Sequence, residues 1–146
     1  MTKEISFFYE DIEEKEINLN QKATKRWLFD CLELYQVCPS VIINFIFVSD
    51  EYLLEMNKTH LNHDFYTDII TFNYNKKNLV SGDMFLSIDR IRDNAKNLSL
   101  TFADELDRVI IHGLLHLIGF NDKTSKEQEE MTKQENRCLE LRLRST

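Results

Sequence analysis

The sequence contains few glycine and proline residues, which favour flexible linkers and interrupt helices and strands. Its 146 residues include three glycines and one proline, which leaves little room for linkers or low-complexity segments, and no internal repeat is visible. No apolar run approaches the roughly 20 residues that a membrane helix requires. We therefore expect a single domain over residues 1–146, long enough to bury a sizeable hydrophobic core.

Cysteine is also scarce, and the 18 basic residues are outnumbered by 25 acidic ones. The three cysteines are odd in number and lack a CxxC spacing, which argues against a disulfide framework and for reduced thiols. The first residues carry acid early and have no apolar signal segment, so cytoplasm is the expected location. A net charge of −7 argues against indiscriminate binding to nucleic acid, because phosphate contacts need clustered lysine and arginine, but it does not exclude a local basic face.

Short β-branched and aromatic runs alternate with stretches of helical periodicity. Strands are expected at residues 5–9, 41–48, 68–73 and 83–88, with a loop at 75–82. Helices are expected at residues 20–35, directly after Ser49, and at 89–98, 101–118 and 125–143. About four strands interleaved with about five helices predict a layered α/β (α+β) domain with a small mixed sheet.

The helix at 101–118 carries the most informative residues. It begins at Thr101, a favoured cap residue, and Gly119 is the residue type that ends a helix in a left-handed conformation. His112 and His116 are four residues apart, so they project from one side of the helix, as two ligands of one metal ion do. Asp122 follows the Gly119 turn closely enough to supply a carboxylate oxygen. Three protein ligands with a fourth position left for water are typical of a catalytic zinc site, although two histidines and an aspartate also suit iron(II).

The rest of this helix is apolar nearly all round, which predicts that it is buried. Two histidines on a buried helix would each cost free energy if they were left without a partner. Metal binding satisfies them, and hydrogen bonding within the core is the alternative for either one.

The residue after His112 argues against one class of zinc hydrolase. Zinc proteases of the HExxH type carry a glutamate there as general base, but this chain has Gly113, so a metalloprotease is disfavoured. The metal itself must then activate water, or a base must come from elsewhere. Asp68, Asp83 and Glu105 lie near the motifs as candidates, and structural roles at strand and helix ends are the alternative for each.

At these residues the sequence resembles the YbeY family of bacterial metallo-endoribonucleases. Residues 112–120 match the family pattern H-G-x-L-H-L-x-G-[YF]-D-H up to the phenylalanine, residues 67–72 resemble T-[DN]-V-L-S-F, and residues 82–87 resemble G-D-I-x-I-S. The resemblance covers roughly residue 57 to the C-terminus, with the blocks in the expected order. It implies a zinc-dependent, single-strand-specific endoribonuclease, with one zinc per chain, that matures ribosomal RNA at the 16S rRNA 3′ end and takes part in ribosome quality control.

Two positions depart from the family pattern. The closing D-H pair is Asn121-Asp122 here, so Asp122 stands where the family has a third histidine ligand. A carboxylate lowers the charge of the site and should make bound water a weaker acid. Leu61 stands where the family usually has an arginine placed to contact phosphate. His60 and His63 beside it are candidate phosphate or proton partners, and exposed loop histidines are the alternative.

Three functions follow from these observations. The first is a zinc-dependent hydrolase that cleaves ribosomal RNA and meets the small ribosomal subunit, with no membrane partner. The second is a ribosome-assembly binding factor whose zinc is chiefly structural, as the leucine at position 61 and the acidic net charge suggest. The third is a hydrolase of peptides or small amides.

Overall fold

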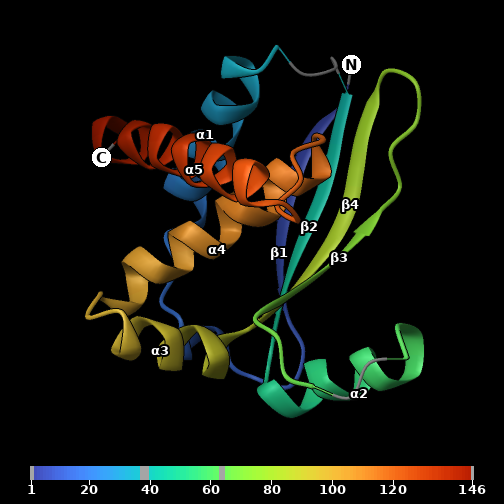
Figure 1. Ribbon diagram of the computed structural model, residues 1–146, viewed down its shortest axis with the longest axis vertical. Helices are drawn as coiled ribbons and strands as arrows, with labels where there is room; N and C mark the ends of the chain where they lie inside the picture. Colours follow the sequence, from blue (N-terminus) through green and yellow to red (C-terminus); the bar gives the residue numbers. More distant parts are fainter. Residues whose placement is uncertain (1, 37–39, 63–64, 146) are drawn as a thin grey trace.

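A four-stranded mixed sheet divides the molecule into two sides (Figure 1). The computed structural model describes residues 2–36, 40–62 and 65–145. Its strands, in spatial order, are β1 (Lys3–Tyr9), β2 (Ser40–Val48), β4 (Leu79–Ser87) and β3 (Ile69–Asn73). The first three are parallel to one another, whereas β3 pairs antiparallel with β4 and forms an edge. The expected α/β class with a small mixed sheet is confirmed.

Five α-helices of the described residues cover the two sides unequally. In Figure 1, four of them lie on one side of the sheet, and they are α1 (Gln21–Leu34), α3 (Ile88–Asn97), α4 (Phe102–Leu117) and α5 (Ser125–Ser145). The remaining helix, α2 (Asp50–His60), packs against the opposite face near the ends of β3 and β4. A short 3₁₀ turn, η1, spans Glu14–Glu16. Within the part of the chain that the structure describes, no helix is both long and apolar enough to cross a bilayer.

Alternating side chains of β4 separate the two faces. Met84 points into the main core beneath α4, whereas Phe85 joins a smaller cluster with Ile46 and Ile70 under α2. The alternation follows from the two-residue period of a strand. The helices α4 and α2 therefore lie on opposite faces of the same strands.

Gly113 sets how closely α4 approaches the sheet. A Cβ atom added there would lie 2.6 Å from Ile69 Cδ1 and 2.7 Å from Met84 Sδ, closer than such atoms can approach. The absence of a side chain thus lets α4 lie directly on β3 and β4 at the level of His112. This is the close backbone packing that a small residue permits.

The structure corrects two local expectations. Residues 79–82, expected in a loop, form the first half of β4, because they pair with β2 in continuous parallel register from Ser40 opposite Leu79. The spacing of Ser125 and Gln128 predicts a capping box that starts at Ser125, but Thr124 caps α5. The Thr124 Oγ accepts from the backbone N–H of Glu127, whose carboxylate accepts from the Thr124 N–H at 3.0 Å. Cys38, Pro39 and Ser40 predict a break after the first helix, and this segment lies mostly outside the described residues.

Candidate metal centre

His112, His116 and Asp122 meet at the C-terminal end of α4. The centroids of the two imidazole rings lie 4.6 Å apart, and the two residues are one helical turn from each other. Asp122 Oδ2 lies 3.3 Å from Nε2 of each ring. Among the described residues, these three are the only group of histidine, cysteine and acidic side chains whose ligand atoms could hold one metal ion.

The local sequence explains why Asp122 returns to the two histidines. The Thr101 hydroxyl accepts from the backbone N–H of Asp104 and so fixes where α4 begins. Gly119, with φ of 114°, takes a conformation that favours glycine and reverses the chain just after the helix. The following residue bonds back to the helix through its N–H, from Phe120 to the Leu115 carbonyl at 3.0 Å.

The donor set fits a divalent metal. Two imidazole nitrogens and one carboxylate oxygen converge, and such sets suit zinc or iron(II). The three side chains are 23%, 31% and 36% exposed, so the site is open to solvent on one side. An open position is the feature that separates catalytic zinc sites from closed structural ones.

A carboxylate that the sequence patterns did not reveal holds His112 from behind. Glu135 on α5 is buried, and its Oε2 lies 2.5 Å from Nδ1 of His112. Burial alone would lower the pKa of His112, but this hydrogen bond, the charge of Glu135 and two further carboxylates raise the pKa above its ordinary value. The contact joins residues 23 positions apart on two helices, so no local spacing could have indicated it.

The three residues line a cleft of about 550 Å³ between α4 and the edge strand β3. Thr67, Ile69, Thr71 and Asn73 form its other wall, and none of its described lining residues is a lysine or arginine. Asp68 also lines the cleft, with Asn94 Nδ2 3.4 Å from its Oδ2, and burial raises the pKa of its carboxyl group. Asp68 is therefore the one general-base candidate from the sequence that the structure brings into the site.

The other candidates lie elsewhere. Asp83 is on the opposite face of β4, where it accepts from Asn44 Nδ2 at 2.9 Å. Glu105 is fully buried beneath the site and binds Arg108. The prediction that either residue serves as the base has no support in the geometry.

The loop that precedes β3 does not supply a histidine to the cleft from its described residues. Leu61 is exposed at the end of α2. His60 packs edge-on against Phe72, with ring centroids 6.4 Å apart, on the face of the sheet away from α4. His63 lies outside the described residues.

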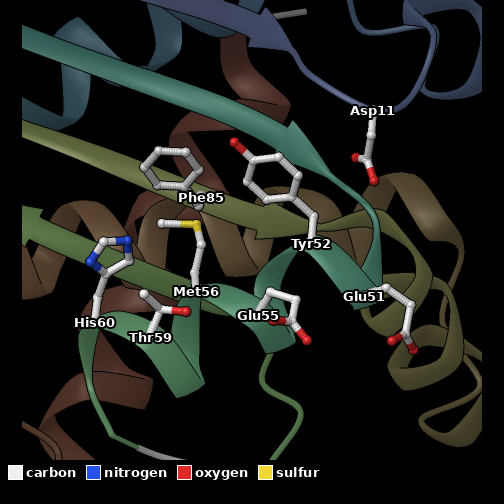
Figure 2. A pocket seen from close by; sticks show the side chains of 8 residues that line it. All are labelled: Asp11, Glu51, Tyr52, Glu55, Met56, Thr59, His60 and Phe85. Atoms are coloured by element: carbon white, nitrogen blue, oxygen red, sulfur yellow. The ribbon is translucent and has the colours of Figure 1, made fainter.

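A second cavity, of about 580 Å³, lies between α2 and that far face (Figure 2). It is lined by Asp11, Glu51, Tyr52, Glu55, Met56, Thr59, His60 and Phe85. In Figure 2 the side chains of Asp11 and Glu51 stand at one end and His60 at the other, around an apolar floor. Three carboxylates without a lysine or arginine among the described lining residues would repel phosphate. The α4 cleft also lacks these cations among its described lining residues, but it holds the group that could bind a metal ion, so it is the better candidate for nucleic-acid chemistry.

Comparisons with known proteins agree with this site. The family model for Endoribonuclease YbeY matches residues 8–142. A relative described as Endoribonuclease YbeY from Cytophaga hutchinsonii is 46% identical over 143 residues, which cover 97% of this chain and 99% of that protein. The relative of the same description from Parabacteroides distasonis is 44% identical and covers 94% of each chain.

A solved structure shares the fold. The solution structure of TM1509 from Thermotoga maritima superposes with a TM-score of 0.69 at 28% identity, over 95% of this chain and 89% of that one. The match of the family model over most of the chain, together with relatives above 40% identity, is decisive. The chain belongs to the YbeY family of endoribonucleases.

Proposed function

We propose that this protein is a metal-dependent endoribonuclease that hydrolyses single-stranded RNA in the cleft between α4 and β3. The observation that carries the proposal is the convergence of His112, His116 and Asp122 at an open position. These residues would hold one zinc ion. Bound there, zinc would lower the pKa of a water molecule enough for it to attack a phosphodiester at neutral pH.

The residues of the cleft have two separate roles, metal binding and proton transfer. His112 and His116 present their Nε2 atoms to the site, and Asp122 supplies an oxygen between them. Asp68 is the other carboxyl group among the described residues that line the cleft, and its burial favours the protonated form. It is therefore placed to exchange a proton with a reacting oxygen, as a general acid or base near neutral pH does.

The shape and surroundings of the cleft suit a single strand of RNA. It runs along an edge strand at the surface, where an extended chain can lie. Asn75, in the β3–β4 connection, donates to the Leu117 carbonyl at 2.8 Å and so ties that connection to the end of α4. The exposed Lys76 and Lys77 follow directly, and we propose that they supply the phosphate contacts that the cleft walls lack.

Family membership supports a more specific role. We propose ribosomal RNA, at the 3′ end of the 16S species, as the substrate, with the small ribosomal subunit as the partner and the cytoplasm as the location. Loss of the family's arginine at Leu61 favours the alternative, an assembly factor with a structural zinc. The solvent-open position beside His116 and Asp122 favours catalysis.

Cleavage of a labelled single-stranded RNA by zinc-loaded protein tests the proposal. His112→Ala and His116→Ala should each abolish cleavage, while His60→Ala, which changes a histidine of the second cavity, should leave the rate unchanged. A duplex of the same sequence should resist cleavage.

Full activity in both purified histidine variants would overturn the proposal. Folded, zinc-loaded wild-type protein that binds the small subunit without cleaving RNA would support the assembly factor instead. Removing zinc would then lower the melting temperature and weaken subunit binding only through unfolding.

A further inference from the structure

We propose that Glu135 is the positioning residue of the metal centre. Its carboxylate accepts the Nδ1–H of His112, which fixes the tautomer and aims Nε2 at the metal. This inference rests on the proposed metal-binding role of His112, and it assigns a task to a residue on another helix.

The contacts of His112 decide which nitrogen carries the proton in the metal-binding form of the ring. Glu135 Oε2 is 2.5 Å from Nδ1 of His112, while Nε2 of the same ring lies 3.3 Å from Asp122 Oδ2. An ionised carboxylate can only accept, so Nδ1 carries a proton, and the neutral, metal-binding form of the ring then has its lone pair on Nε2. Nε2 then faces the same point as Nε2 of His116. Histidines that bind metals regularly donate their second nitrogen to a carboxylate in this way.

Glu135 is itself held in place from below. Arg108 Nη1 lies 3.8 Å from Glu135 Oε1, and the same guanidinium bonds both oxygens of Glu105, with Nε to Oε1 at 2.7 Å. Glu105 is fully buried and Glu135 nearly so. Burying a carboxylate costs free energy unless it is paired. The ion pair with Arg108 therefore stabilises Glu135 in the position from which it orients His112.

The network also leaves an uncompensated negative charge beneath the site. Glu105 and Glu135 contribute two negative charges and Arg108 one positive charge. One negative charge therefore remains, and it lies against the back of His112. It stabilises any positive charge placed on the other side of the ring, which raises the affinity for a divalent ion.

A purely structural role is the alternative reading, because Glu135 also joins α5 to α4. The chain offers a matched control for it. Arg142 on α5 lies 3.3 Å from Asp107 on α4 through Nε and Oδ2, and both side chains are 16% exposed. This second ion pair connects the same two helices but contacts neither histidine of the site. Asp107→Asn weakens this link between the helices and leaves the metal centre alone.

The experiment compares Glu135→Gln with Asp107→Asn in the full-length protein. The dissociation constant for zinc is measured by competition with a chromophoric chelator, and the protonated nitrogen of His112 by ¹⁵N NMR of histidine-labelled, zinc-loaded protein. Glu135→Gln should weaken zinc binding by about 10-fold or more, the range typical for the partners of metal ligands. Asp107→Asn should change it by less than about twofold, since distant sites act independently. Wild-type protein and Asp107→Asn should both show a slowly exchanging proton on Nδ1 of His112. In Glu135→Gln this proton should exchange faster, because a neutral amide oxygen accepts it more weakly than a carboxylate does.

Equal zinc affinity in wild-type protein and Glu135→Gln would overturn the inference, and so would a His112 proton on Nε2. Parallel decreases of affinity in both variants would assign Glu135 a structural role and also overturn it. His112→Ala separates this from failure of the proposed function. If that variant keeps its zinc, the ligand set is wrong; if it loses zinc while Glu135→Gln does not, only the positioning role fails.

Discussion

One stripe of α4 carries most of the ionic chemistry of the site. Glu105, Arg108, His112 and His116 follow at intervals of three and four residues, so they line one side of the helix. Glu105 and Arg108, at the start of the stripe, form an ion pair in which Glu105 is fully buried. His112 and His116, at its end, line the cleft together with Asp68. At the scale of single residues, the charged side chains of this stripe are therefore buried near Glu105 and become partly exposed at His112 and His116.

Asp68 should make the stability of the metal-free protein depend on pH. Burial raises the pKa of its carboxyl group in the folded protein, against the opposing charges of His112 and Arg108. At pH values below the ordinary pKa of about 4, folded and unfolded chains are both protonated and the group contributes nothing. As pH rises from there through the folded pKa, the unfolded chain ionises more readily and metal-free protein loses stability.

Asp68→Asn should remove this loss of stability. In urea unfolding of metal-free protein, the variant should be more stable than wild type at neutral pH, and the difference should shrink as pH falls toward 4. An advantage of the same size at every pH would contradict the origin assigned to it.

At the scale of elements, capping and packing residues account for what the sequence predicted well. Thr101 and Gly119 mark the two ends of α4, and the histidine spacing fixes one face, so the convergence of His112, His116 and Asp122 was accessible to local rules. Glu135 was not, because its contact with His112 depends on how α4 and α5 cross. The first half of β4 was missed for a related reason: its pairing with β2 lies outside any local pattern.

Gly113 offers a test of the packing between α4 and the sheet. In an exposed helix, replacing glycine by alanine adds about 0.5–1 kcal/mol of stability. Here the added methyl group would overlap Ile69 and Met84, so Gly113→Ala should instead destabilise the protein by about 1–3 kcal/mol. Urea unfolding measures the difference, and a variant more stable than wild type would show that the helix does not lie so close.

The β3–β4 connection should act in RNA binding. Lys76→Gln/Lys77→Gln should weaken binding to single-stranded RNA and reduce the slope of log affinity against log salt by about 0.7 for each phosphate that the variant no longer neutralises. Lys22→Gln/Lys25→Gln removes the same charge from α1, which contributes nothing to the cleft. Fluorescence anisotropy over a salt series compares them, and equal slopes in both double variants would remove the connection from the RNA path.

At the scale of the whole molecule, the sheet separates two environments. The candidate metal centre and its cleft lie on the α4 side, at the open edge of β3. The second cavity, with its three carboxylates, lies on the other face under α2 (Figure 2). Three of the acidic side chains that contribute to the net charge of −7 therefore lie on the face away from the cleft.

The overall architecture was only partly accessible from the sequence. Alternating strand and helix patterns predicted the α/β class, because each pattern has its own period. The order β1-β2-β4-β3 was not predictable, since it depends on crossover connections that no local signal encodes. That order is what leaves β3 at an edge beside His112 and His116, and so creates the cleft.

The central claim is that His112, His116 and Asp122 together hold one metal ion. Elemental analysis of purified protein tests it most directly, with Asp122→Ala beside wild type and Asp122→His as the control that restores a ligand. We expect about one equivalent of zinc per chain in wild type and in Asp122→His, in line with one tetrahedral site, and a clear decrease in Asp122→Ala. Unchanged zinc content in Asp122→Ala would contradict the account.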